Sequence, residues 1–196
     1  MASICGLTLK NEEPVNETNT KWDLFLNNKK IGSCLKDDAD NVGIDFSFNY
    51  DLLNPIVVKV RKSFSKNPME RDNYNIASLL SDLFDLTTIE KEYKEEKDRN
   101  PNSPLVLVVF KCNQEFFYLF NDEPQVCAKT NKEIIKEVFP ALLSIYDVLP
   151  VVKSTNLSVF RCIDDFNVKL WKGDQIWLMN LMKRVQKAKI LDYIRR

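Results

Sequence analysis

The sequence predicts an α+β protein with a mainly antiparallel sheet, an N-terminal three-stranded meander, later hairpins and three or four helices. Two observations predict this class. Strand-like segments follow one another along the chain and can pair locally, and longer helical segments separate these groups of strands. The predicted order is strands, helix, hairpin, helix, strands and helix, whereas parallel α/β proteins alternate strands and helices one by one.

The N-terminal region is predicted to be rich in strands. Residues 4–9 suit a strand, and the polar residues 11–20 (NEEPVNETNT) are expected to form a loop. The segments WDLFL and KIGSCL flank Asn27-Asn28. They predict a β-hairpin, because asparagine tolerates the left-handed backbone of a tight turn. In residues 42–48 (VGIDFSF) apolar side chains alternate with others, as in a strand with one buried face.

Two helices are predicted next. Residues 54–66 begin with Asn54-Pro55, a favourable cap followed by a favourable first helical residue, although the β-branched run IVVKV also suits a strand. Residues 75–99 carry apolar side chains at helical spacing and end just before two prolines. We therefore expect a helix over each range, with the longer one at 75–99.

A second hairpin is predicted over residues 105–120, and its apolar first strand suits a central place in a sheet. Thr130 and Glu133 fit a capping box at the start of a helix that reaches about residue 149. Pro140 is expected to bend or split that helix.

The last part of the chain is predicted to contain two short strands and one helix. Residues 157–163 and 167–171 are expected to pair with each other as strands. The turn residues Lys172-Gly173-Asp174 lead into a helix from about residue 175 to the end.

The length of 196 residues suits one α+β domain, with an alternative division into a β-rich unit, 1–66, and an α+β unit, 67–196. The longest purely apolar run, 105–110, is far too short for a bilayer span, which needs about 20 residues. No signal peptide is recognised, and the five cysteines include no C-x-x-C pair. We therefore expect a cytoplasmic protein with reduced thiols.

The composition excludes several chemistries. The chain contains no histidine, so the usual serine and cysteine catalytic triads and histidine-bearing zinc sites are excluded. Phosphate-binding glycine motifs are missing from the sequence. We therefore expect neither a catalytic residue nor a cofactor. Abundant asparagine and lysine with only four glycines indicate an AT-rich genome, such as that of a bacterium or a phage.

Acidic residues between the predicted strand that contains KIGSCL and the predicted strand 42–48 are candidates for a cation site. The candidate ligands are Asp38, Asp40 and Asp45. An EF-hand counted from Asp38 fails at two ligand positions, where Val42 and Asn49 stand. Two E-x-K triplets, 92–94 and 95–97, match half of a nuclease motif but fall on a charged helix. A solvated turn and a solvated helix are the favoured interpretations.

Residues 171–196 are predicted to be a partner surface. They carry seven basic residues and two acidic ones, a net charge of +5 in a chain whose net charge is zero. Residues 82–98 carry a net charge of −4, which could attract this segment or an opposite copy in a homodimer. Ile190 and Ile194 leave the apolar stripe of the helix. The predicted contact residues are Lys183, Arg184, Lys187, Ile190, Ile194 and Arg195.

These observations predict a non-catalytic protein that binds a macromolecule, preferably a protein, in an accessory role natural to a phage or a mobile element. One alternative is a nucleic-acid-binding protein that uses the basic C-terminal helix. Another is a metal-dependent carboxylate hydrolase or nuclease that uses the acidic loop.

Overall fold

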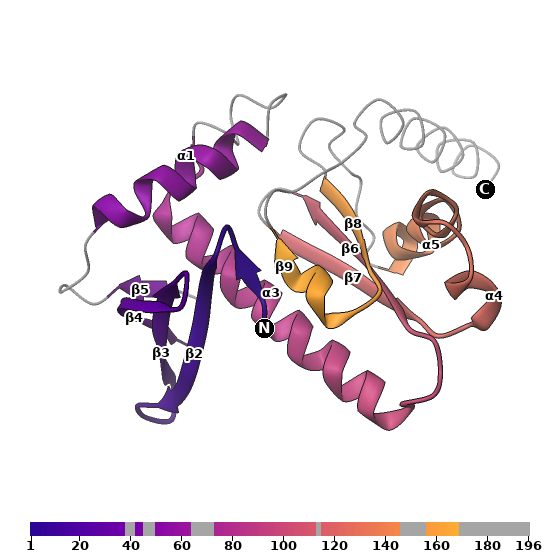
Figure 1. Ribbon diagram of the computed structural model, residues 1–196, viewed down its shortest axis with the longest axis horizontal. Coiled ribbons are helices and arrows are strands. Elements are labelled where there is room, and N and C mark those ends of the chain that lie inside the picture. The colour runs from indigo at the N-terminus through magenta and orange to yellow at the C-terminus, as the bar shows by residue number, and fades with distance from the viewer. Residues whose placement is uncertain (38–41, 45–49, 64–72, 113–114, 146–155, 169–196) are drawn as a thin grey trace, which may run out of the picture. The chain divides into compact units, whose positions relative to one another are not determined.

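A computed structural model of the chain describes residues 1–37, 42–44, 50–63, 73–112, 115–145 and 156–168 (Figure 1). These residues form helices and two mainly antiparallel sheets, so the α+β prediction is confirmed. The chain divides into two compact units. Unit 1 is Met1–Asp98 with Cys162–Leu170, and unit 2 is Arg99–Arg161 with Trp171–Arg196.

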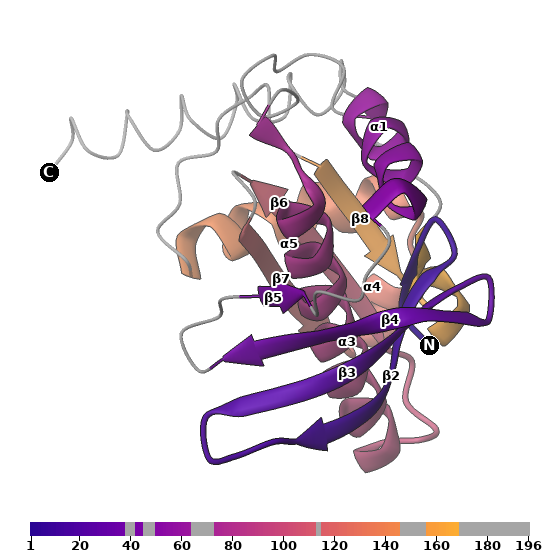
Figure 2. The same ribbon diagram turned by 90° about the vertical axis from the view of Figure 1, so that its left-hand side faces the viewer.

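The sheet of unit 1 has the strand order β5-β4-β3-β2-β1-β9 (Figures 1 and 2). Its strands are β1 (Ser3–Ile4), β2 (Leu7–Pro14), β3 (Asn19–Leu26), β4 (Lys29–Asp37), β5 (Val42–Ile44) and β9 (Asn167–Val168). Consecutive strands pair antiparallel, while β1 and β9 pair parallel. The predicted meander is therefore confirmed as β3, β4 and β5 and is extended on the β2 side, while residues 45–48 of its third predicted strand lie outside the described residues.

The turn between β3 and β4 forms as predicted. Asn27 and Asn28 have φ values of 50° and 67°, the left-handed conformation that a two-residue hairpin turn requires. The loop predicted over residues 11–20 is shorter than expected and comprises residues 15–18, because β2 continues to Pro14 and β3 begins at Asn19. A bulge between Lys10 and Glu13 lets the polar segment remain in the strand.

The helices of unit 1 are η1 (Tyr50–Leu52), α1 (Asn54–Ser63), α3 (Ile76–Arg99) and η2 (Ile163–Phe166). The helix predicted over 54–66 is confirmed for residues 54–63, while residues 64–66 lie outside the described residues, and the helix predicted over 75–99 is confirmed. Asn75 caps α3, since its side-chain oxygen accepts the N–H of Ser78 at 3.0 Å. The apolar side of α3 and the inward side chains of β2 and β3 are buried together in the core of this unit.

Unit 2 contains a sheet of order β7-β6-β8, with β6 (Val106–Cys112), β7 (Glu115–Asn121) and β8 (Asn156–Phe160). The predicted hairpin is β6 with β7, and β6 is central as expected. Its helices are α4 (Pro124–Cys127) and α5 (Asn131–Ile145). Phe139 of α5 packs edge-on against Phe110 of β6, with ring centroids 5.2 Å apart.

One of the two hydrogen bonds of the predicted capping box forms at the start of α5. The N–H of Thr130 donates to Glu133 Oε2 at 2.9 Å, and the Thr130 hydroxyl donates to the same oxygen at 2.6 Å. Pro140 lies inside α5, which continues to Ile145 without being split. Residues 146–149, the predicted end of this helix, lie outside the described residues.

The predicted pairing of 157–163 with 167–171 is wrong. β8 pairs with β6, whereas β9 pairs with β1 in the other unit. Ile163, the predicted end of the first strand, instead begins η2, and Phe166 is buried there against Tyr93, with ring centroids 5.5 Å apart. The helix predicted from residue 175 lies outside the described residues. Within the described ranges every helix is too short or too polar to span a bilayer.

Candidate functional site

All of the predicted site residues lie outside the described residues. This applies to the candidate cation ligands Asp38, Asp40 and Asp45. It applies equally to the predicted contact residues of the last helix, Lys183, Arg184, Lys187, Ile190, Ile194 and Arg195. These assignments therefore stay predictions.

The described part of the chain holds no group of three or more side chains suited to a metal ion. The two E-x-K triplets, 92–94 and 95–97, lie on α3, as expected for a charged helix. In η2, Asp165 accepts the backbone N–H of Cys162 at 3.1 Å, so this carboxylate caps a turn. These carboxylates are explained by helix and turn structure.

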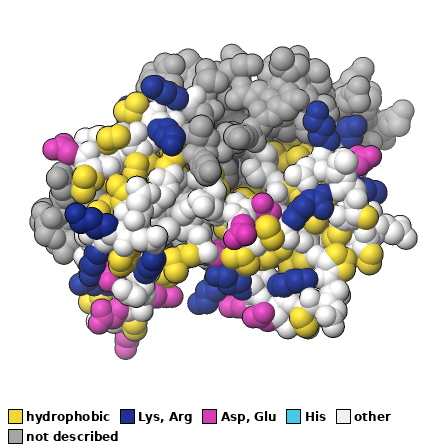
Figure 3. Space-filling view, viewed as in Figure 1, with side chains coloured by type: hydrophobic (Ala, Val, Ile, Leu, Met, Phe, Trp, Pro, Cys, Tyr) yellow, Lys and Arg dark blue, Asp and Glu magenta, His cyan; other side chains and the backbone are white. Residues whose placement is uncertain are grey.

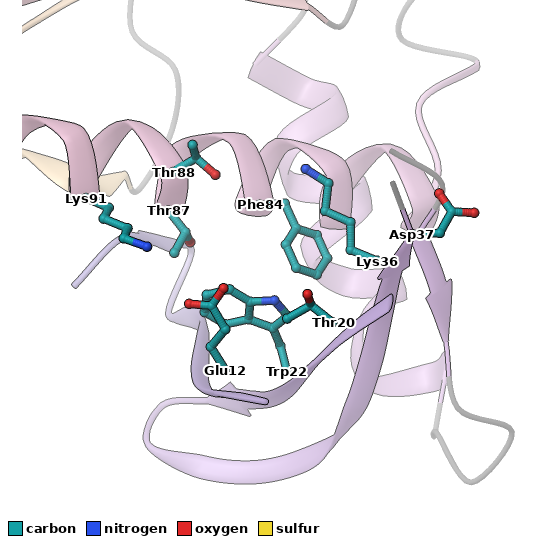
Figure 4. A pocket seen from close by; sticks show the side chains of 9 residues that line it. All are labelled: Glu12, Thr20, Trp22, Lys36, Asp37, Phe84, Thr87, Thr88 and Lys91. Atoms are coloured by element: carbon teal, nitrogen blue, oxygen red, sulfur yellow. The ribbon is translucent and has the colours of Figure 1, made fainter. Parts of the chain in front are cut away.

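A pocket of about 340 Å³ lies in unit 1 between the sheet and α3 (Figure 4). We call it the aromatic pocket. Glu12, Thr20, Trp22, Lys36 and Asp37 line it from the sheet. Phe84, Thr87, Thr88 and Lys91 line it from α3. Three strands and one helix of the same unit thus build it.

The periodicity of the elements explains why these side chains meet. Thr20 and Trp22 are two residues apart on β3, so they point to the same face of the sheet. Thr20 pairs with Lys36 of β4, which places Lys36 on that face as well. Positions 84, 87, 88 and 91 are three or four residues apart and therefore share one side of α3.

The interior of the aromatic pocket is formed by two rings. Trp22 and Phe84 meet edge to face, with centroids 6.0 Å apart and an interplanar angle of 82°. Phe84 is buried and Trp22 is half-buried, so part of the indole is accessible. The Lys36 ammonium lies 5.8 Å from the centroid of the Phe84 ring, within the range of a cation–π contact.

The rim of the aromatic pocket carries charges of both signs. Glu12 and Lys91 are exposed, and neither forms an ion pair or a hydrogen bond with another residue in the described part of the chain. Figure 4 shows Lys36 reaching toward Phe84, whereas Asp37 lies at the margin. Among the described residues that line the pocket, two carboxylates and two ammonium groups give no net formal charge.

A second pocket of unit 1, about 320 Å³ in volume, lies where the β1–β2 and β3–β4 turns meet. We call it the polar pocket. Its polar side chains are Ser3, Thr8, Lys10, Asn27, Asn28 and Asn167. The Asn27 N–H donates to the Gly6 carbonyl at 2.9 Å and holds the two turns together.

The buried thiols are poor nucleophiles. Burial raises the pKa of Cys34 to about 12, and the negative charge of Asp23 adds to this effect. Burial is also the largest cause of the raised pKa values of Cys5 and Cys127. Because the thiolate is the reactive form, these raised pKa values lower the reactivity of the three thiols at neutral pH.

Neither pocket follows from the sequence alone. Trp22 and Lys36 are 14 positions apart, and Phe84 is far from both along the chain. For the polar pocket, the Asn27-Asn28 turn is a local signal, but this signal predicts only a hairpin.

Comparison with known proteins adds no assignment. No family model matches the chain, and neither a curated protein nor a solved structure matches it significantly. Function is therefore inferred from the side chains of the described residues.

Proposed function

We propose that the protein is a non-catalytic binding protein that holds a segment of a protein partner in the aromatic pocket. The observation that supports this proposal is the accessible Trp22 ring, which lies against Phe84 in a hollow whose rim carries the exposed charges of Glu12 and Lys91. Aromatic side chains are enriched at protein interfaces, because they bury a large area and lose little conformational entropy.

The charges of the lining favour a peptide. An extended peptide has apolar side chains that can pack against the two rings. Its backbone N–H and C=O groups can form hydrogen bonds with the polar side chains of the rim. The Glu12 carboxylate can accept from such an N–H group, and the Lys91 ammonium and the Thr88 hydroxyl can donate to a carbonyl. A neutral lining suits a neutral peptide backbone.

A nucleic acid fits the aromatic pocket less well. Its phosphates require an excess of basic side chains, whereas this lining has as many carboxylates as ammonium groups. On the face seen in Figure 3, acidic and basic side chains are interspersed over the β2–β3 region. The basic residues near the C-terminus keep nucleic-acid binding as an alternative proposal, tested below at the scale of the molecule.

Peptide selection with a matched pair of variants tests the proposal. Random peptides are selected on the full chain, and their affinities are then measured for Thr88→Arg and Ala77→Arg. Both changes add one arginine to an exposed position of α3, but only Thr88 lines the aromatic pocket. We expect Thr88→Arg to weaken binding about tenfold or more, a loss typical of an obstructed interface centre.

Ala77→Arg should leave the affinity unchanged. Equal affinities for the wild type and both variants would contradict the proposal, as would a selection that enriches no peptide. Circular dichroism of the variants checks that α3 remains folded.

A further inference from the structure

We propose that the polar pocket binds the phosphate group of a small phosphate monoester. This site is separate from the aromatic pocket and does not depend on the proposed protein partner. Its side chains offer hydroxyl, amide and ammonium hydrogen-bond donors, and none of the described residues that line it carries a carboxylate. A pocket of about 320 Å³ has the size of a small-molecule site.

Two left-handed turns build this pocket. Cys5 and Gly6 have φ values of 53° and 84°, and Asn27 and Asn28 have values of 50° and 67°. A Cβ atom at Gly6 would lie 2.3 Å from Asn27 Oδ1, which no side chain allows without displacement. Glycine is therefore required here, and the Asn27 amide is packed against the neighbouring turn.

The hydrogen bonds within the pocket leave donors available. Asn28 Oδ1 accepts from the Lys10 ammonium at 3.3 Å, so the Asn28 amide nitrogen is left as a donor. Asn167 Oδ1 accepts from the Ser3 hydroxyl at 2.6 Å, and the Asn167 amide nitrogen is likewise left as a donor. Each asparagine thus uses its oxygen internally and can offer N–H groups to a ligand.

The Lys10 ammonium supplies the positive charge. It lies 4.8 Å from the centroid of the Phe25 ring, a cation–π contact that helps to hold the side chain in place. The Thr8 hydroxyl oxygen is buried and has no hydrogen-bond partner among the described residues. An oxyanion at this position would give that hydroxyl a partner as well as neutralising Lys10.

The neighbouring acidic residue does not compete for Lys10. Met1, which also lines the pocket, directs its ammonium to Glu90 Oε1 at 2.8 Å, and Lys94 contacts the same oxygen at 2.8 Å. The charge of Glu90 is therefore neutralised by its own partners. A phosphate monoester, with three terminal acceptor oxygens and a charge near −2, matches a set of donors that come from several strands and turns.

Calorimetric titration of the full chain tests this proposal with inorganic phosphate, a hexose phosphate and the unphosphorylated hexose. We expect both phosphates to bind with dissociation constants on the order of 1 mM or lower, and the free hexose not to bind. Tighter binding of the hexose phosphate would assign the site to an ester, whereas equal binding would assign it to the phosphate group alone.

Three variants locate the site. Lys10→Met removes the charge, and Asn28→Asp replaces an amide donor by a carboxylate of the same shape. Each should weaken phosphate binding about tenfold or more, because hydrogen bonds to charged groups are the strong ones. Lys29→Met removes an exposed lysine that does not line the pocket and should leave binding unchanged.

Failure of both phosphates to bind at millimolar concentration would overturn the proposal. Equal weakening by Lys10→Met and Lys29→Met would also overturn it, because it would indicate a general charge effect. Circular dichroism shows whether Asn28→Asp retains its fold, and Lys10→Met, which changes no turn residue, gives an independent test.

Discussion

At the scale of residues, Glu90 is the clearest case of a buried charge that is stabilised by its partners. It is 3% exposed, yet it accepts the backbone N–H of Ala2 at 2.6 Å and the ammonium groups of Met1 and Lys94 at 2.8 Å each. Burial raises the pKa of Glu90, but the hydrogen bonds from Lys94, Met1 and Ala2 outweigh it and lower the pKa from its usual 4.5. Glu90 is therefore ionised and joins the N-terminal residues to α3.

Glu90→Gln should destabilise unit 1, because it preserves the shape of the side chain but leaves the Met1 and Lys94 ammonium groups without a counter-charge. We expect a loss of about 1–3 kcal/mol in the free energy of unfolding, measured by urea denaturation at neutral pH. Glu95→Gln, on the exposed side of α3, should change it very little. Equal stability of wild type and Glu90→Gln would contradict the assigned role.

The same residue predicts a pH dependence. A carboxyl whose pKa is lowered by folding contributes stability above its unfolded pKa and loses it as the pH falls through the folded one. The difference in stability between wild type and Glu90→Gln should therefore be full above the usual pKa of 4.5 and shrink below it. Urea denaturation across this pH range measures it, and a pH-independent difference would exclude the ionised carboxylate as its source.

At the scale of elements, Arg161 joins the end of β8 to the connection between α4 and α5. Its Nε donates to Asn131 Oδ1 at 2.8 Å, and one terminal nitrogen donates to the Cys127 carbonyl at 2.8 Å. The other terminal nitrogen donates to the Lys129 carbonyl. A planar guanidinium can serve these three acceptors together, which a lysine ammonium cannot do with the same geometry.

Arg161→Lys should therefore destabilise unit 2 by about 1–2 kcal/mol, even though the charge is conserved. Thermal unfolding followed by circular dichroism measures the effect. A melting temperature equal to that of the wild type would mean that these hydrogen bonds contribute no net stability.

Elements with local signals were predictable from the sequence. The asparagine turn at 27–28, the helical spacing of 75–99 and the capping box at Thr130 each depend on neighbours within a few residues. The continuation of β2 to Pro14 was not predictable in this way, because polar residues there are held by cross-strand pairs such as Glu13 with Lys21. The parallel pair of Ser3 with Asn167 joins distant parts of the chain and leaves no local signal.

The two pockets are also not predictable from local sequence signals, because their residues come from distant parts of the chain. The aromatic pocket needs α3 to be placed on the sheet, so its lining is defined by tertiary packing. The net charge of −4 carried by residues 82–98 does not describe a charged surface, because two of the acidic residues, Asp82 and Glu90, are buried. Tyr74 donates to Asp82 at 2.8 Å, so this carboxylate belongs to the core.

At the scale of the whole molecule, charge balance separates protein binding from nucleic-acid binding. The chain has 28 basic and 28 acidic residues, and its predicted basic surface is confined to the last helix. If phosphates were the target, affinity for duplex DNA would fall steeply with salt, since each contact releases counterions. We expect no retention of duplex DNA in filter binding at low salt. Retention that disappears at higher salt would favour the alternative.

The protein-binding proposal is tested most directly by nuclear magnetic resonance of the full chain during titration with a selected peptide. The Trp22 indole N–H and the backbone N–H of Thr88 both report on the aromatic pocket. We expect these signals to shift together in the wild type, and we expect the Trp22 signal to stay unchanged when the same peptide concentration is added to Thr88→Arg. Peptide binding that shifts signals elsewhere and leaves Trp22 and Thr88 unaffected would contradict the assignment of this pocket as the binding site.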